Sequence, residues 1–191
     1  LNKNGKTIEA GTGGGRIVFE LEKTGFTQLE AFDYVEKMIE FCCKKKYNLN
    51  SSINFNIANA TNLENYKTNT FDYLIYLQQV LCFIDIDKLP EALTEAHRIG
   101  NEESIYLYSF LNWDSKFYNP ILSKLVNLFR VLRAEKTDKY KLPWLKLNGK
   151  FNWKFLNKNQ PQNRWYKETD ITNILENNGF LIIESKSKLN T

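Results

Sequence analysis

Histidine, cysteine, proline and arginine are scarce in this sequence of 191 residues, which holds one, three, four and five of them respectively. Three cysteines make no disulfide framework, and a domain of this length needs none, so we expect a reducing, cytoplasmic location. Cys42, Cys43 and Cys82 have no partners at metal-ligand spacing and are expected to pack in the fold, with no metal site. The single His97 falls late in a helical pattern, where we expect a surface residue and not a base.

Long apolar runs are also absent, since no stretch approaches the roughly 18 apolar residues of a membrane-spanning helix. The net charge is only +4, and lysines outnumber arginines 21 to 5. Proteins that read phosphate groups favour the planar fork of arginine, so we expect no nucleic-acid partner. The absence of a long apolar run leads us to expect no membrane partner. The first residue is Leu1 and not Met, so we expect these residues to belong to a longer chain.

Short β-rich runs alternate with longer stretches of helical spacing. The runs are Lys6–Ala10, Leu29–Phe32, Ile53–Ala58, Phe71–Leu77, Ile105–Phe110 and Phe180–Glu184, and the helical stretches are Tyr34–Lys46, Leu89–Ile99 and Asp170–Asn177. Their apolar residues recur at helical intervals; the first helical face is Val35, Met38, Ile39 and Cys42. Such alternation predicts an α/β fold of Rossmann-like, doubly wound type, with a mainly parallel sheet and helices on both faces.

One segment breaks the alternation, and we expect a single domain over 1–191 with an insertion at about 112–166. Asn119-Pro120 predicts a helix start, followed by an apolar pattern. This pattern consists of Leu122, Leu125, Val126, Phe129 and Leu132. Further on, Asn148-Gly149 predicts a β-hairpin. A two-residue loop would place its apolar rows on opposite faces, so we expect a three-residue loop that unites Leu145, Leu147, Phe151, Trp153 and Phe155.

The strongest local signal is a glycine-rich turn after the first predicted strand. Residues Glu9 to Gly15 read E-x-G-x-G-x-G, and glycines allow the backbone to turn sharply against a ligand. Asp33 ends the second strand, where an acid can accept hydrogen bonds from ribose hydroxyls, and Asn59-Ala60 follows the third. Three strand ends therefore converge on one edge of the sheet, which is where open α/β sheets bind ligands.

These residues resemble the class I (Rossmann-like) S-adenosylmethionine-dependent methyltransferases, over nearly the whole chain. The turn is similar to the family's first motif, Asp33-Tyr34 to its acid-ended second strand, and Asn59-Ala60 to the Asp-Ala pair beside the adenine. Phe71-Asp72 resembles the opening of the fourth strand, and Gly179-Phe180 the exit from the last helix. Asn59 departs from the usual Asp, and the family's seventh strand is not located; the hairpin is one candidate for it.

The resemblance implies S-adenosylmethionine as cofactor and S-adenosylhomocysteine as product. The implied cofactor-binding residues are Glu9, Gly11, Thr12, Gly13, Gly15, Asp33, Tyr34, Asn59, Ala60, Leu77 and Gln78. The implied reaction is direct displacement at the methyl carbon, which needs no protein nucleophile, and no catalytic residue is assigned. Positioning of the two reactants would supply most of the acceleration.

There are four alternatives, and three of them disagree with particular residues. A nucleotide-cofactor oxidoreductase would prefer G-x-G-x-x-G, whereas the spacing here is G-x-G-x-G. Base amino-methyltransferases carry Asn/Asp-Pro-Pro-aromatic after the fourth strand, and metal-assisted transferases carry carboxylates there. The segment Leu77 to Leu81 has neither. A non-catalytic methyltransferase-like binding or scaffolding domain remains the alternative that keeps the fold.

The acceptor is expected to be a small organic molecule methylated at O, N or C, with most of its pocket formed by residues 112–166. This segment holds all four tryptophans, and small-molecule pockets are largely apolar and aromatic. Trp113, Tyr118 and Gln78 are the candidate acceptor-binding residues, with Asn112 and Asp114 as further polar groups. Alternatively, these aromatics pack the insertion onto the domain or form a dimer contact; a monomer and a homodimer are both compatible with the sequence.

Overall fold

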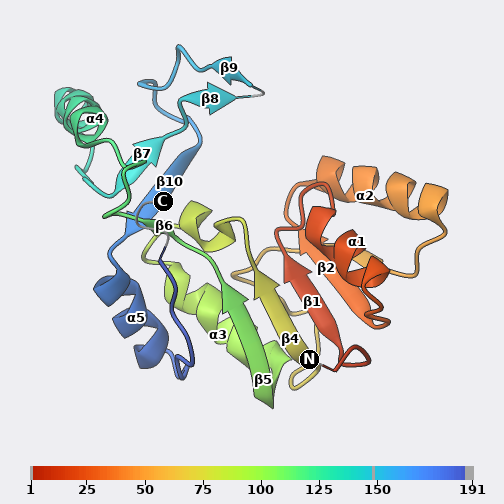
Figure 1. The fold of residues 1–191 in the computed structure, drawn as a ribbon. Coiled ribbons are helices and arrows are strands. Elements are labelled where there is room, and N and C mark those ends of the chain that lie inside the picture. The colour runs from red at the N-terminus through yellow and green to blue at the C-terminus, as the bar shows by residue number, and fades with distance from the viewer. Residues whose placement is uncertain (1, 148, 188–191) are drawn as a thin grey trace. The chain divides into compact units, whose positions relative to one another are not determined.

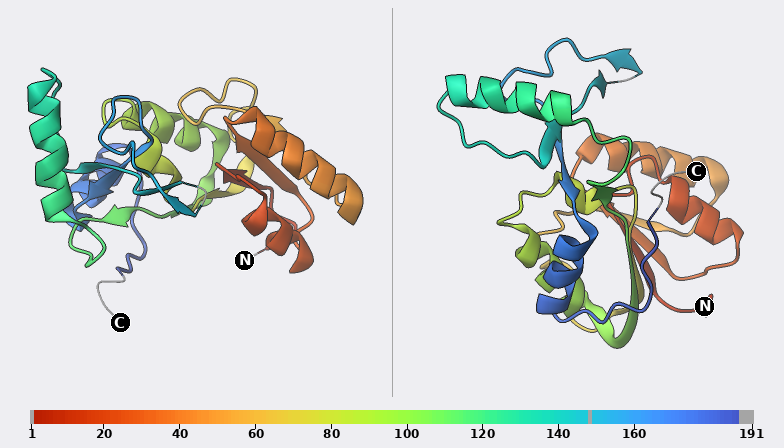
Figure 2. Two further views of the ribbon diagram at one scale, coloured as in Figure 1. Left: turned by 90° about the horizontal axis from the view of Figure 1, so that it is seen from above. Right: turned by 60° about the vertical axis from the view of Figure 1, so that its left-hand side comes forward.

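The computed structural model describes residues 2–147 and 149–187 (Figures 1 and 2). The chain divides into two compact units, which are described separately. The N-terminal unit comprises Leu1–Leu81 and Ile86–Ser109, and the C-terminal unit comprises Cys82–Asp85 and Phe110–Thr191. The expected insertion at 112–166 thus lies inside the C-terminal unit. Among the described residues, no helix is long and apolar enough to cross a lipid bilayer.

A five-stranded, entirely parallel sheet forms the centre of the N-terminal unit (Figure 1). Its strands are β1 (Thr7–Ala10), β2 (Leu29–Asp33), β3 (Asn54–Ile57), β4 (Phe71–Tyr76) and β5 (Gly100–Tyr108). The order across the sheet is β3-β2-β1-β4-β5. The register aligns Thr7 of β1 with Leu29 on one side and with Tyr73 on the other. The predicted α/β, doubly wound fold class is confirmed.

Three helices connect these strands: α1 (Arg16–Lys23), α2 (Glu36–Leu49) and α3 (Leu89–Ile99). Right-handed crossovers place α1 and α2 on one face of the sheet and α3 on the other, because the chain reverses direction across the sheet after β3. The predicted inner face of α3 is confirmed, since Leu89, Ala92, Leu93 and Ala96 are fully buried. On α2 the prediction is wrong for Met38, whose side chain is 43% exposed.

The C-terminal unit contains a second, smaller sheet of order β6-β10-β7. Its elements are β6 (Leu111–Asn112), α4 (Pro120–Leu132), β7 (Lys141–Pro143), β8 (Lys146–Leu147), β9 (Lys150–Phe151), β10 (Gln162–Tyr166) and α5 (Glu168–Asn177). A 3₁₀ turn, η1 (Val80–Phe83), begins at the end of the N-terminal unit's first segment and includes Cys82 and Phe83, the first residues of the C-terminal unit. Helix α4 begins as predicted, with the Asn119 side chain accepting a hydrogen bond from the Leu122 N–H at 2.9 Å.

Two sequence predictions about strands are wrong. In the β8–β9 hairpin, Leu147 pairs with Lys150, so the loop has two residues and not three. The reason is local: Asn-Gly favours two-residue turns, Gly149 takes φ 77°, and Asn148 itself lies outside the described residues. The expected common face also fails, because Trp153 is 84% exposed while Leu145 and Phe155 pack on a core. Residues Phe180–Glu184 form no strand, because no neighbouring backbone pairs with them in the described part of the chain.

Candidate functional site

The glycine turn follows β1 and is shaped by three left-handed backbone positions. Gly11, Gly13 and Gly15 take φ of 61°, 52° and 74°, which side chains rarely tolerate. A Cβ on Gly11 would lie 2.6 Å from the Val80 side chain, and one on Gly15 would lie 2.7 Å from the Phe19 ring. A Cβ on Gly13 would meet nothing within 4 Å. The outer two glycines therefore pack against protein, and the middle one faces open space.

Glu9 lies beneath this turn and braces it. Its side chain is buried, and one carboxylate oxygen, Oε2, accepts hydrogen bonds from the Thr12 hydroxyl at 2.6 Å and from the Val18 N–H at 3.1 Å. The pKa of the Glu9 carboxyl is raised from its ordinary 4.5 to about 7, mainly by burial, with a smaller contribution from the nearby Asp33. Thr12 is likewise buried. Both side chains therefore support the backbone of the turn from within.

Asp33 ties the end of β2 to the same turn. Its Oδ2 accepts a hydrogen bond from the Gly13 N–H at 2.9 Å, and its Oδ1 accepts one from the Val35 N–H at 2.9 Å. Each carboxylate oxygen has two lone pairs, so both retain a position for a further donor such as a ribose hydroxyl. The sequence placed Asp33 near the glycines by analogy; the structure brings it into direct contact with Gly13.

Helix α2 supplies contacts that the sequence reasoning missed. The Cys42 thiol donates to the Gly13 carbonyl at 3.1 Å, and burial raises the pKa of this thiol to about 11, which keeps it protonated. The Phe41 ring lies 3.7 Å from the place of a Cβ on Gly14, and is itself 55% exposed. Tyr34, just after β2, is 76% exposed. The predicted inward position of Cys42 was the available signal, but periodicity does not identify a partner.

The exit of β3 continues the same edge of the sheet. The Ala58 N–H donates to the Asp33 carbonyl oxygen at 3.1 Å, which holds this exit beside that of β2. The side chain of Asn59 is exposed, and its Oδ1 accepts a hydrogen bond from the Thr61 N–H at 3.1 Å. Ala60 is buried. Asn59 thus retains its amide nitrogen and one oxygen lone pair for contacts outside the protein.

The exit of β4 has a strained backbone. Gln78 and Gln79 take φ of 58° and 61°, and two successive left-handed residues other than glycine are uncommon. The Gln79 N–H donates to the Ser109 hydroxyl at 3.0 Å, which helps to hold the turn. Strain of this kind is concentrated at functional sites. Leu77 and Gln78 were predicted here, whereas the left-handed Gln79 was not, because glutamine carries no turn signal.

All of these exits lie along the same edge of the sheet, at the carboxyl ends of the strands. The chain places β2 and β3 on one side of β1 and β4 and β5 on the other, so the strand order reverses between β1 and β4. The glycine turn leaves β1 and the Gln78–Gln79 turn leaves β4, with Val80 packed on Gly11. A crevice outside the carboxyl ends of strands at such a reversal is the general ligand site of open α/β sheets. The structure therefore unites the predicted cofactor residues of the N-terminal unit.

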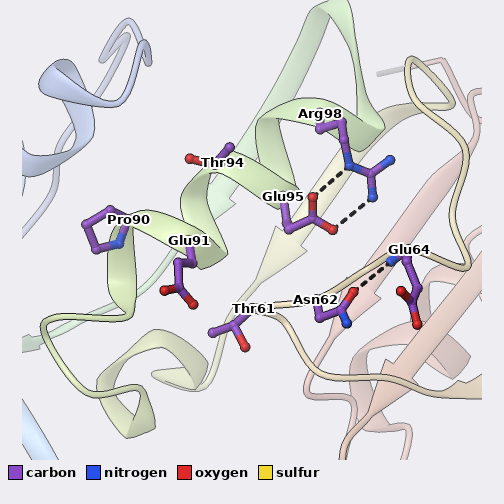
Figure 3. Close-up of a pocket in the computed structure, with 8 residues that line it drawn as sticks. All are labelled: Thr61, Asn62, Glu64, Pro90, Glu91, Thr94, Glu95 and Arg98. Atoms are coloured by element: carbon purple, nitrogen blue, oxygen red, sulfur yellow. Dashed lines mark hydrogen bonds and ion pairs between the residues drawn. The ribbon is translucent and has the colours of Figure 1, made fainter.

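A separate hollow of about 550 Å³ lies against α3 (Figure 3). It is lined by Thr61, Asn62, Glu64, Pro90, Glu91, Thr94, Glu95 and Arg98. Arg98 donates to both carboxylate oxygens of Glu95 and to the carbonyls of Leu63 and Tyr66, which fixes the loop after β3 to the helix. None of the predicted cofactor residues lines this hollow, and its charged pair is already satisfied.

The predicted acceptor residues Trp113 and Tyr118 lie in the C-terminal unit and contact each other. Their ring centroids are 3.9 Å apart, and Tyr140 and Trp165 extend the cluster at 4.6 Å and 5.6 Å. The Tyr118 hydroxyl donates to the Lys139 carbonyl at 2.8 Å. Ring contacts of this kind are expected if these aromatic residues have a packing role. Gln78, the third candidate, belongs to the N-terminal unit.

Comparison with known proteins adds a family to this geometry. The sequence matches the family described as "Methyltransferase domain" over residues 1–179, and a search of curated proteins found no match. A SAM-dependent methyltransferase from Methanosarcina mazei superposes with a TM-score of 0.71 at 16% identity, over 93% of this chain and 80% of its own. The PH0226 protein of Pyrococcus horikoshii OT3 superposes with a TM-score of 0.66 at 18% identity, over 92% of this chain and 73% of its own. PKMT2 from Rickettsia typhi, solved in complex with AdoHcy, superposes with a TM-score of 0.56 at 15% identity, over 72% of this chain and 26% of its own.

The fold is that of a Rossmann-like domain, with a glycine turn at its candidate site. The chain belongs to the methyltransferase domain family, since the match covers nearly all of it. At these identities the solved structures show the shared fold. The predicted resemblance to class I S-adenosylmethionine-dependent methyltransferases is thereby confirmed, with S-adenosylmethionine as the methyl donor of that class.

Proposed function

We propose that this protein transfers a methyl group from S-adenosylmethionine to an O, N or C atom of a small organic acceptor. The observation that carries the proposal is the open face of the glycine turn. Gly13 has room for atoms on the side where its Cβ would stand, and its backbone is held by Asp33 and Cys42. A preorganised backbone with open space beside it fits a bound methionyl chain.

The neighbouring residues would hold the rest of the cofactor. The free lone pairs of the Asp33 carboxylate suit ribose hydroxyls, and the exposed Tyr34 ring offers an apolar surface for the adenine or ribose. Asn59 can accept from an adenine amino group through its remaining oxygen lone pair. Ala60, Leu77 and Gln78 would line the same crevice. Glu9 and Thr12 act from below, by fixing the shape of the turn.

In the proposed reaction the side chains position the reactants and do not form covalent bonds with them. When bound, S-adenosylmethionine supplies a methyl group on a sulfonium, whose sulfur leaves as a neutral thioether. The protein's role is to hold the acceptor close and in line with that methyl group, where effective molarities are large. No base is needed unless the acceptor atom carries a proton. His97 is exposed on α3, outside the predicted site.

The acceptor pocket is proposed to include Trp113 and Tyr118. Their cluster offers apolar surface, and the adjacent Asn112 and Asp114 offer polar groups, the composition typical of small-molecule pockets. The same ring contacts are compatible with a purely packing role. An experiment must therefore separate acceptor binding from cofactor binding.

Single substitutions Trp113→Ala and Tyr118→Ala test this pocket. We expect S-adenosylhomocysteine affinity by calorimetry to stay within about twofold, while transfer of labelled methyl to small molecules of a metabolite extract falls at least tenfold, or roughly 1.4 kcal/mol. Trp153→Ala, which removes an exposed tryptophan of the hairpin, is the matched control and should leave both quantities unchanged. Unchanged transfer in both test variants would place the pocket elsewhere.

A further inference from the structure

Helix α4 presents an apolar stripe on the face opposite its packed side. Leu122 and Val126 are buried in a core with Leu142, as the predicted helix requires. The opposite face should be polar in a surface helix, but it consists of aliphatic side chains. These are Ile121, Leu125, Leu128, Val131 and Leu132, which are 78%, 38%, 56%, 61% and 73% exposed. Lys124 is the one charged residue among them.

The sequence pattern alone did not distinguish the two faces. It grouped Leu125 and Leu132 with Leu122 and Val126 in one apolar pattern, and the structure divides this pattern into a buried pair, Leu122 and Val126, and an exposed pair, Leu125 and Leu132. At about 100° per residue, positions 121, 125, 128 and 132 share one side of the helix, and 122 and 126 point away from it. An exposed aliphatic stripe of this kind marks an interaction surface or a membrane contact.

The segment that carries the stripe has a strongly one-sided charge. Residues 112–166 hold twelve basic and three acidic side chains, whereas the rest of the chain holds fourteen basic and nineteen acidic ones. Nine of the twelve are exposed: Lys116, Lys124, Arg133, Lys136, Lys139, Lys146, Lys150, Lys154 and Lys158. The modest net charge of +4 hides this asymmetry. The expectation of no membrane partner rested on the absence of a long apolar run, which does not bear on a helix that lies on a membrane surface.

We propose that the exposed face of α4 binds the surface of an anionic lipid membrane. An apolar helix face inserts among acyl chains while surrounding lysines meet the acidic headgroups, and the two contributions reinforce each other. The helix contributes the first element, and the exposed basic side chains of the same segment, Lys124 on α4 itself among them, contribute the second. This proposal concerns location and goes beyond methyl transfer.

Charge and side-chain chemistry favour this occupant over two others. A second copy of the chain would bring two equally basic surfaces together, which like-charge repulsion opposes. A nucleic acid would satisfy the charge, but its bases stack on aromatic rings, and the stripe is aliphatic. An anionic bilayer matches both the charge and the aliphatic surface.

The test is co-sedimentation of the 191-residue protein with vesicles. We expect binding to phosphatidylcholine vesicles that contain phosphatidylserine, weaker binding to phosphatidylcholine alone, and release by added salt. Leu128→Glu should lower binding to the anionic vesicles at least about tenfold, because it removes apolar contact and adds a repelled charge. Leu49→Glu, at the similarly exposed end of α2, is the matched control and should bind normally.

Four results would overturn the proposal. The first is equal binding to both kinds of vesicle, or binding to neither. The second is a dimer in solution that Leu128→Glu dissociates, which would assign the face to a second copy. The third is binding to single-stranded RNA that the same variant abolishes. The fourth is a much larger fall in melting temperature for Leu128→Glu than for Leu49→Glu, which would show that the face packs against protein.

Discussion

At the scale of single residues, the three glycines of the turn have different roles despite their similar φ values. Gly11 and Gly15 stand where a side chain would collide with Val80 and Phe19. Gly13 has no such neighbour, and only its backbone conformation demands glycine. At Gly11 and Gly15 glycine is needed because neighbouring side chains leave no room for a Cβ, which is a requirement of the fold. At Gly13 the space is open and can receive a ligand.

Alanine at these two kinds of position should therefore separate folding from binding. We expect Gly13→Ala to lose only about 1 kcal/mol of stability, the cost of left-handed backbone, yet to lose most S-adenosylhomocysteine affinity because its methyl group occupies the open side. Gly15→Ala should lose several times more stability, since its Cβ meets the Phe19 ring at 2.7 Å. Urea denaturation and calorimetry measure the two quantities. Unaltered affinity in folded Gly13→Ala would contradict the proposed site.

Glu9 should make the free energy of unfolding depend on pH, and the sign of this dependence follows from the pKa of its carboxyl. The folded carboxyl titrates near 7 and the unfolded one near 4.5, so the folded state holds a proton between those values and unfolding releases it. The free energy of unfolding should thus fall as pH rises from about 4.5 to about 7, by at most roughly 3 kcal/mol, and then level off.

The variant Glu9→Gln should remove this contribution. Both donors to Glu9 reach the same oxygen, so a glutamine carbonyl can accept both hydrogen bonds and the turn should keep its shape. We expect Glu9→Gln to be more stable than the natural protein above about pH 7 and to lack its decline. Denaturation across this pH range decides the matter, and an identical decline in both proteins would assign the titration to another group.

At the scale of elements, patterns with one interpretation were predicted and patterns with two were not. Helix α3 matches its predicted bounds, because a regular apolar face with a following glycine leaves no alternative. Helix α4 carries apolar residues on both its packed and its exposed face, so periodicity could not tell one face from the other. The run Phe180–Glu184 reads as a strand, but a strand forms only where another backbone pairs with it.

The candidate site divides in the same way. Glycine spacing and the acid at Asp33 indicated the site, because each residue type suggests its own role: glycine allows a sharp turn, and a carboxylate accepts hydrogen bonds. The Cys42 thiol and the left-handed Gln79 could not be predicted, since their partners, the Gly13 carbonyl and the Ser109 hydroxyl, are distant in sequence and meet them only in the folded protein. The hairpin register failed because a shared apolar face was preferred over the turn chemistry of Asn-Gly.

The start of α4 offers a test of an element that was predicted from sequence. Asn119 caps the Leu122 N–H, and Asn119→Ala should lower the free energy of unfolding by about 1 kcal/mol. Asn119→Asp keeps a capping oxygen and should remain close to the natural protein. Urea denaturation of both variants gives the comparison. Equal stability of alanine and asparagine would mean that the cap contributes nothing to α4.

At the scale of the whole molecule, all of the predicted cofactor residues lie in the N-terminal unit, and the predicted aromatic acceptor residues lie in the C-terminal unit. The two functions should therefore respond independently to substitution. Binding that favours the native state raises stability by an amount set only by ligand concentration and affinity. Ligand-dependent stability thus reports on the first unit whatever the acceptor proves to be.

We expect S-adenosylhomocysteine at a hundredfold excess over its Kd to raise the free energy of unfolding by about 2.7 kcal/mol. Trp113→Ala should show the same rise, and Gly13→Ala should show almost none at that concentration. NAD should give no rise, because the turn lacks the third-glycine spacing that dinucleotide sites use. Thermal and chemical unfolding with each ligand provide the measurement. Stabilisation by NAD would instead favour an oxidoreductase, and stabilisation by neither ligand would favour a binding domain that keeps the fold without the reaction.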